Sequence, residues 1–238
     1  MQGVSHTTSL SWSCVIAAAS VEMIASCYAV GSAALSILHI KKKIASFEVE
    51  KLYVMRKKIL VVVDYQYDFY SPQGALYVAG GENLQKEIAD IVPDFDHVLF
   101  TQDCHPASHC SFDRNGGQWP VHCVEQTLGA EIPNELIALC SSYTISKKGC
   151  NQNMEEYGAF ADKDASEGLF AGAQSVVVCG IAGDYCVLET LKNIVSIVGT
   201  DCVSVYLDGV ASIDGGTALS SYMTEQGIKE YKVGVEFS

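Results

Sequence analysis

The residue with the greatest potential for chemistry is Cys186, within Gly-Ile-Ala-Gly-Asp-Tyr-Cys-Val at positions 180–187. An apolar run at residues 175–179 is typical of a buried strand, and helical spacing begins near residue 185, so Cys186 falls where a strand turns into a helix. The positive end of a helix dipole favours the thiolate, which is the nucleophilic form. Unpaired N–H groups at a helix start can also hold an oxyanion. This pattern predicts covalent acyl chemistry at Cys186, the alternative being an inert packing residue.

A carboxylate stands at the end of a second apolar run. Residues 59–63 read as a short buried strand, and Asp64 follows it directly. Ligands of open α/β sheets bind at the carboxyl ends of the strands. Asp64 is therefore a candidate acceptor for the proton of Cys186, the alternative being a cap for the following turn.

Two histidines and an aspartate have the spacing of metal ligands. Asp103 and His105 lie two residues apart, which puts both side chains on one face of an extended backbone, and His122 can complete the set from a nearby loop. One carboxylate with two imidazoles suits a divalent transition metal, with Zn²⁺ expected first and Mn²⁺ or Fe²⁺ as alternatives. His109 is left outside this set, as a fourth ligand, a neighbour of the ligands or a surface residue. Thiolate ligation is the alternative to free thiols for three nearby cysteines, Cys104, Cys110 and Cys123.

Strand-like and helix-like runs alternate through most of the chain. Strands are expected at residues 59–63, 97–101, 143–146, 175–179, 203–207 and 232–235, and helices at residues 82–92, 131–139, 164–171, 185–197 and 215–225. This alternation predicts an α/β protein with a three-layer, Rossmann-like fold: a mostly parallel six-stranded sheet with helices on both faces. A Gly-x-Gly-x-x-Gly turn is missing after the first strand, which argues against a dinucleotide cofactor.

The ordered motifs from about residue 57 onward resemble the cysteine hydrolases of the isochorismatase-like superfamily and, within it, the nicotinamidase family. The matching segments are Asp-Tyr-Gln-Tyr-Asp-Phe at 64–69, Asp-Cys-His-Pro at 103–106, Trp-Pro-Val-His-Cys at 119–123, Lys-Gly at 148–149 with Tyr-Gly-Ala-Phe at 157–160, and the segment 180–187. Tyr67 and Gly183 depart from the family pattern, which usually has Asn and Thr there.

The resemblance implies a role for each motif. Asp64, Lys148 and Cys186 would form a catalytic triad, and the backbone N–H groups of Ala182 and Cys186 an oxyanion hole beside a cis Ile181–Ala182 peptide. It also implies metal binding by Asp103, His105 and His122, and substrate binding by Phe69, Trp119 and Tyr157. The expected activity is deamidation of nicotinamide to nicotinic acid and ammonia through a cysteine thioester, as in NAD salvage. Another small amide, or isochorismate, is the alternative substrate.

Neighbouring lysines compete for the triad position. The glycine after Lys148 and the distance to Tyr157 favour Lys148, which leaves Lys147 on the opposite face of the strand.

The charge of the chain narrows the class of partner. The formal net charge is −13, and the only arginines are Arg56 and Arg114, so nucleic acid is a poor partner. A site for the two carboxylates of isochorismate is expected to offer guanidinium groups, which favours a neutral amide here. A small-molecule substrate is therefore expected, and homo-oligomerisation is left open.

The first 54 residues do not fit the motif pattern. Residues 15–38 approach the length of a membrane span but are diluted by Glu22 and small polar residues. We expect residues 1–54 to be an N-terminal extension that is either disordered or not native to the catalytic fold, with a membrane anchor as an alternative, and residues 55–238 to form the hydrolase domain. No membrane contact is expected for that domain, and the expected location is the cytoplasm.

Overall fold

Residues 57–234 are described by the structure, a computed structural model. The expectations for residues 1–54 therefore lie outside the described residues. Among residues 57–234, no helix is long and apolar enough to cross a membrane.

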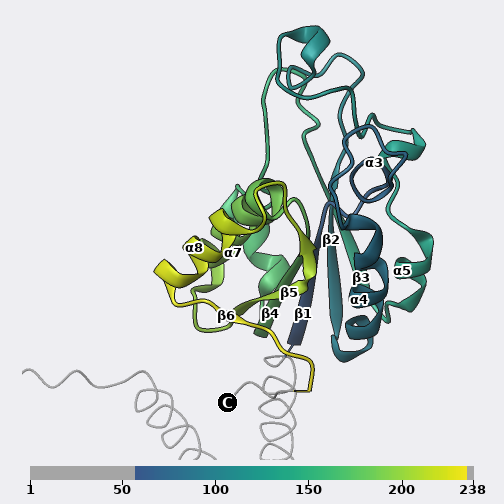
Figure 1. Cartoon of the computed structure of the whole chain (residues 1–238). Coiled ribbons are helices and arrows are strands. Elements are labelled where there is room, and N and C mark those ends of the chain that lie inside the picture. The colour runs from purple at the N-terminus through teal and green to yellow at the C-terminus, as the bar shows by residue number, and fades with distance from the viewer. Residues whose placement is uncertain (1–56, 235–238) are drawn as a thin grey trace, which may run out of the picture. The chain divides into compact units, whose positions relative to one another are not determined.

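Parallel strands form a single sheet in the order β3-β2-β1-β4-β5-β6 (Figure 1). Their bounds are β1 (Lys57–Val63), β2 (His97–Asp103), β3 (Tyr143–Lys148), β4 (Ala173–Ile181), β5 (Val203–Ala211) and β6 (Lys229–Glu230). The α/β fold predicted from the sequence is confirmed, and all of its strand pairs are parallel. The expected sixth strand at residues 232–235 is wrong: β6 lies earlier, directly after the helix that ends at Gln226, and Val233 is exposed rather than paired.

Helices cover both faces of the sheet. They are α3 (Tyr67–Tyr70), α4 (Leu84–Ile91), α5 (Asn134–Leu139), α6 (Lys163–Ser166), α7 (Leu188–Val198) and α8 (Thr217–Gln226). Helix α5 begins three residues later than predicted because Pro133 keeps the residue before it out of the helical region. The segment expected as one helix at residues 164–171 divides into α6 and a 3-10 turn, Glu167–Phe170.

Alternation along β1 divides the core into two layers. Leu60 and Val62 pack with residues of α4 and α5, whereas Ile59, Val61 and Val63 pack with residues of α7 and α8. Figure 1 shows these two helix pairs on opposite sides of the sheet. Because both faces are buried, β1 is a continuous apolar run, as expected for a central parallel strand.

The strand order reverses between β1 and β4, which are neighbours at the centre of the sheet. Beyond the carboxyl ends of β1 and β4 the chain turns away in opposite directions, and such a crevice is the usual ligand site of this architecture. Asp64 directly follows β1, and Cys186 lies five residues beyond the end of β4. The fold thus places both residues at one edge of the sheet.

Candidate active site

A buried amino group joins the candidate catalytic residues. Lys148 Nζ lies 2.8 Å from Asp64 Oδ2, 2.6 Å from Asp103 Oδ1 and 3.6 Å from Cys186 Sγ. One carboxylate oxygen from Asp64, one from Asp103 and the sulfur of Cys186 all lie within 4.8 Å of one another. The structure thus brings together Asp64, Lys148 and Cys186, which come from the ends of β1, β3 and β4.

The burial of the two neighbouring lysines favours Lys148 as the candidate catalytic residue. Lys148, the last residue of β3, is 6% exposed and points into the cluster, whereas Lys147 is exposed. In the sheet Lys148 is paired with Asp103, the last residue of β2, so the ion pair joins the ends of adjacent strands. The prediction that Lys147 points to the opposite face agrees with this alternation.

Asp64 is fully buried and held by the neighbouring strand. Its backbone has a φ of 44°, a left-handed conformation that is rare for residues other than glycine and that turns the chain sharply after β1. The hydroxyl of Thr101, on β2, donates to Asp64 Oδ1 at 2.5 Å and accepts from the Asp64 N–H at 3.1 Å. Thr101 therefore fixes the carboxylate that faces Lys148. Nothing in the sequence pattern indicates this role of Thr101.

Burial and neighbouring charges shift the pKa of each of the three candidate catalytic residues. Burial raises the pKa of Asp64, and the charge of Lys148 opposes this only in part. Burial also raises the pKa of Cys186 well above its ordinary value, and the two nearby carboxylates add to this effect. Burial alone would lower the pKa of Lys148, but Asp103 and Asp64 outweigh it and raise that pKa well above the ordinary value. Burial and the two carboxylates therefore favour the thiol form of Cys186, against the charge of Lys148 and the helix dipole, which favour thiolate.

A second cluster lies beside the first and consists of Asp103, His105 and His122. One ligand atom from each residue lies within 4.8 Å of the others, and all three residues are buried. His105 Nδ1 donates to the Gly149 carbonyl at 3.0 Å, and His122 Nδ1 donates to the Pro120 carbonyl at 2.7 Å. Each imidazole is thereby left with Nε2 as its free acceptor, the arrangement common for metal-ligating histidines. These donors fit a divalent metal ion.

Asp103 belongs to both clusters. Its Oδ1 accepts from Lys148, while its Oδ2 lies 3.6 Å from His105 Nε2. Burial would raise the pKa of Asp103, but the charge of Lys148 and the contact with His105 lower it overall. Gln66, a second residue missed in the sequence, fixes the backbone of Asp103 by accepting its N–H and donating to its carbonyl, both at 2.8 Å.

His109 is buried beside the metal cluster, but both of its ring nitrogens are engaged. Nδ1 lies 2.7 Å from Ser111 Oγ, and Nε2 lies 3.0 Å from the Met154 carbonyl. Its ring lies against that of His105, with centroids 4.2 Å apart. It is therefore a neighbour of the ligands rather than one of them. Among residues 57–234, the nearby cysteines, Cys104, Cys110 and Cys123, belong to no group with ligand atoms this close together.

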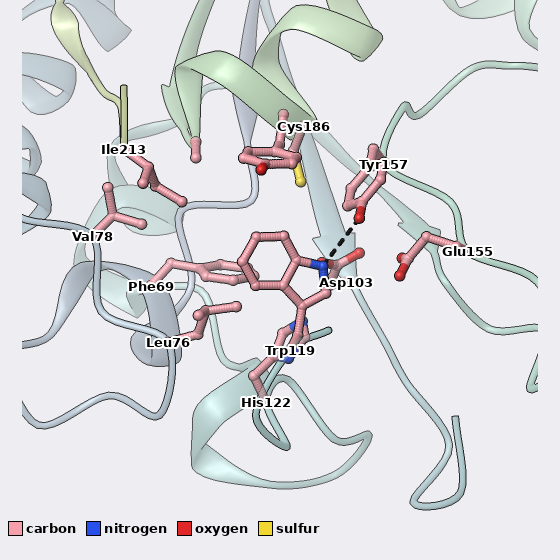
Figure 2. A pocket seen from close by; sticks show the side chains of 12 residues that line it. Phe69, Leu76, Val78, Asp103, Trp119, His122, Glu155, Tyr157, Cys186 and Ile213 are labelled. Atoms are coloured by element: carbon pink, nitrogen blue, oxygen red, sulfur yellow. Dashed lines mark hydrogen bonds between the residues drawn. The ribbon is translucent and has the colours of Figure 1, made fainter. Parts of the chain in front are cut away.

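A pocket opens above both clusters (Figure 2). Phe69, Trp119 and Tyr157, for which the family resemblance implies substrate binding, line this pocket. The indole N–H of Trp119 donates to the Tyr157 hydroxyl at 3.0 Å. Ala182, expected in the oxyanion hole, lines the pocket as well, and the lining residues that were not foreseen are mostly apolar or aromatic, with one additional acid: Leu76, Val78, Tyr185, Ile213 and Glu155. Among residues 57–234, no lysine or arginine lines this pocket.

The turn that carries Cys186 is wider than an α-helical turn. Residues Gly183–Val187 form a π-helical turn that leads into α7. The carbonyl of Ala182 accepts from the amides of Tyr185 and Val187, and the amide of Cys186 between them is not part of that pattern. The peptide between Ile181 and Ala182 is cis, as expected. π-Helical turns of this kind occur frequently at functional sites.

Comparison with known proteins agrees with this geometry. The isochorismatase domain family matches residues 58–217. A nicotinamidase of Acinetobacter baylyi is 36% identical over 154 residues, covering 55% of this chain and 71% of that protein. The solved structure of PnC1 from L. infantum in complex with nicotinate is 32% identical, with a TM-score of 0.65, and covers 74% of this chain and 92% of that one. The pyrazinamidase of Pyrococcus horikoshii in complex with zinc is 29% identical, with a TM-score of 0.64, and covers 74% and 99% respectively. The chain therefore belongs to the isochorismatase-like hydrolases and, within them, to the nicotinamidase family of amidases.

Proposed function

We propose that this protein hydrolyses nicotinamide to nicotinic acid and ammonia, with Cys186 as the nucleophile, and so serves NAD salvage. The observation that carries the proposal is the contact of Lys148 with Asp64, Asp103 and Cys186 beneath a pocket with aromatic walls. Nicotinamide is flat and neutral, and aromatic walls suit such a ring. The family relationship, through a nicotinamidase and a structure with bound nicotinate, supports the same substrate.

In the proposed mechanism, Asp64 acts as the proton carrier. Its burial and raised pKa suit a carboxylate that must accept the proton of Cys186 and later release it. As the proton leaves the sulfur, the thiolate attacks the carboxamide carbon, and Lys148 stabilises the negative charge that builds up in the cluster. Protonated Asp64 then donates to the leaving nitrogen, the C–N bond breaks, and ammonia departs from a thioester.

Hydrolysis of the thioester reuses the same groups. Asp64 accepts a proton from a water molecule, whose oxygen attacks the thioester carbon. The C–S bond then breaks to release the carboxylic acid, and Asp64 returns the proton to the sulfur, which regenerates the thiol and the ionised carboxylate. In both stages the negative carbonyl oxygen would be held by the N–H groups of Ala182 and Cys186. Loss of one such donor typically costs about a hundredfold or more in rate.

The metal cluster is proposed to orient the substrate. Asp103, His105 and His122 would hold a divalent ion, with Zn²⁺ expected first and Mn²⁺ or Fe²⁺ as alternatives. When bound, such an ion supplies a Lewis-acid site for the pyridine nitrogen. Phe69, Trp119 and Tyr157 would contact the ring and hold the amide toward Cys186. The zinc complex of the related pyrazinamidase supports this assignment.

Isochorismate is a weaker candidate substrate because it carries two carboxylates. The charged side chains that line the pocket, Asp103 and Glu155, are both acidic. Among residues 57–234 the lining offers no guanidinium group for a bidentate contact with either carboxylate, and a neutral amide needs none. We propose the cytoplasm as the location, since the described cysteines are all unpaired and a reducing compartment keeps thiols free.

The deciding assay is ammonia release from nicotinamide, measured with and without a chelator. We expect Cys186→Ala to abolish ammonia release. Cys202→Ala removes a thiol that does not line the pocket and should leave ammonia release unchanged. Chelation should weaken nicotinamide binding. Near-normal turnover by Cys186→Ala would discard the cysteine mechanism, and ammonia release from other amides in place of nicotinamide would identify a different substrate.

A further inference from the structure

An apolar side chain stands at the mouth of the pocket with little protein covering it. Ile213, in the loop between β5 and α8, lines the pocket but is 55% exposed. Figure 2 shows it with Val78 at the end of the pocket away from Tyr157 and Glu155. Leu76 lines the pocket as well, so one end is aliphatic and the other carries the polar groups. A ligand that covered this aliphatic end would remove apolar surface from water.

The position of Ile213 is set by the turn that carries Cys186. The backbone N–H of Ile213 donates to Asp184 Oδ1 at 2.9 Å. Ser212 lies against Gly183 so closely that a Cβ added to that glycine would lie 2.0 Å from Ser212 Oγ. The loop can therefore approach the turn only because residue 183 has no side chain. The hydrogen bond to Asp184 holds the loop in this position.

The proposed substrate orientation determines what Ile213 would contact. A nicotinamide ring with its amide at Cys186 and its nitrogen toward Asp103 and His122 turns carbons 4 and 5 to the remaining side. That side is the aliphatic end formed by Ile213 and Val78. A hydrogen atom at carbon 5 leaves Ile213 partly uncovered, whereas a methyl group there would bury more of it.

We propose that Ile213 is a specificity-determining residue, that the pocket accepts pyridinecarboxamides with a small apolar substituent at ring carbon 5, and that Asp184 is the positioning residue for Ile213. This inference rests on the proposed function and adds a substrate class to it.

The test compares ammonia release from nicotinamide and from 5-methylnicotinamide. We expect the intact protein to give a kcat/KM for the methylated amide at least equal to that for nicotinamide. Ile213→Ser should lower the ratio of the two values about fourfold, the effect typical of losing the burial of one methylene-sized group. Leu139→Ser, which changes a side chain of α5 that is 46% exposed, is the matched control and should leave the ratio unchanged.

Substitutions at Asp184 provide a second, independent test. Asp184→Ala removes the acceptor for the Ile213 N–H and should shift the ratio in the same direction as Ile213→Ser. Asp184→Asn keeps an acceptor oxygen and should retain the ratio of the intact protein. A role of Asp184 in stability alone would change both substrates equally and would leave the ratio constant in all variants.

Two results would overturn the inference: rejection of 5-methylnicotinamide by the intact protein, or an unchanged ratio in Ile213→Ser. If Ile213→Ser does not fold, the intact protein still decides, because it should prefer 5-methylnicotinamide to 5-aminonicotinamide, a polar analogue of similar size. Absence of ammonia release from nicotinamide itself would instead refute the proposed function, so the two failures are distinguishable.

Discussion

Removing the Thr101 hydroxyl tests whether Asp64 carries the proton. The hydroxyl donates to Asp64 Oδ1 at 2.5 Å and stabilises the ionised carboxylate, so it lowers the pKa of Asp64 against the larger effect of burial. Thr101→Val has nearly the same shape but lacks this donor. The pKa of Asp64 should therefore rise in the variant. Since the mechanism needs ionised Asp64 in the free enzyme, the acid limb of the kcat/KM profile should move to higher pH.

The size of the effect follows from the energy of a hydrogen bond to a charged group. Such a bond contributes about 1.5 to 3 kcal/mol, and 1.4 kcal/mol corresponds to a factor of ten. On the acid side of the profile, kcat/KM of Thr101→Val should thus be about tenfold or more below that of the unmodified protein. At pH values above the acid limb of both profiles, the two values should converge. The assay is ammonia release from nicotinamide at low substrate concentration across the acid range.

Thr101→Ser is the matched control because it keeps the hydroxyl and both of its hydrogen bonds to Asp64. Its pH profile should superimpose on that of the unmodified protein. Thr101→Val also leaves the Asp64 N–H without its acceptor, so thermal unfolding should be followed to ensure that both variants are folded under assay conditions. A Thr101→Val profile that does not move, or that moves to lower pH, would refute Asp64 as the proton acceptor.

Changes at other positions give further expected outcomes. In Gly149→Ala the new Cβ would lie 2.4 Å from His105 Cε1, so metal affinity measured by titration should fall about 10- to 100-fold. Gly199→Ala is the control. Gly199 has a similar positive φ but no atom close to the position of the new Cβ, so this variant should bind metal like the unmodified protein. Lys148→Met leaves two buried carboxylates without their cation and should lower the free energy of unfolding in urea by about 3 to 5 kcal/mol. This loss should shrink at acid pH, where the carboxylates become protonated; an equal loss at all pH values would contradict the ion-pair explanation. Tyr157→Phe removes the acceptor of the indole N–H and should raise KM for nicotinamide about fivefold with little change in kcat; an unchanged KM would show that the hydroxyl does not order the pocket wall.

The sequence predicts the site well where a side chain directly follows a buried strand. Asp64 and Asp103 stand at the ends of two apolar runs, and parallel strands bring such ends to one edge. For that reason the triad and the metal cluster could be assembled from spacing and family resemblance. The same logic failed for β6, because Val233 is an apolar residue beyond the last paired strand and not part of one.

Residues that act through neighbouring side chains could not be predicted from the sequence. Thr101 lies within an apolar strand, and nothing in its spacing indicates that its hydroxyl meets Asp64. Ile213 and Leu76 belong to loops, where periodicity does not specify which way a side chain points. The raised pKa of Cys186 could not be predicted either, because a position at a helix start does not show that two carboxylates lie beside the sulfur in the folded protein.

The shared carboxylate of Asp103 determines how ligand variants must be interpreted. Its Oδ1 holds Lys148 while its Oδ2 faces His105, so Asp103→Asn would disturb the triad and the metal cluster together. His122 belongs to the metal cluster but is not among the hydrogen-bond or ion-pair partners of Lys148 within residues 57–234, and its Nδ1 donates to the Pro120 carbonyl of its own loop. A change at His122 therefore removes one metal ligand while Lys148 keeps both carboxylates. If metal binding serves only to orient the substrate, loss of His122 should raise KM without changing the pH profile set by Asp64, whereas loss of Asp103 should alter both.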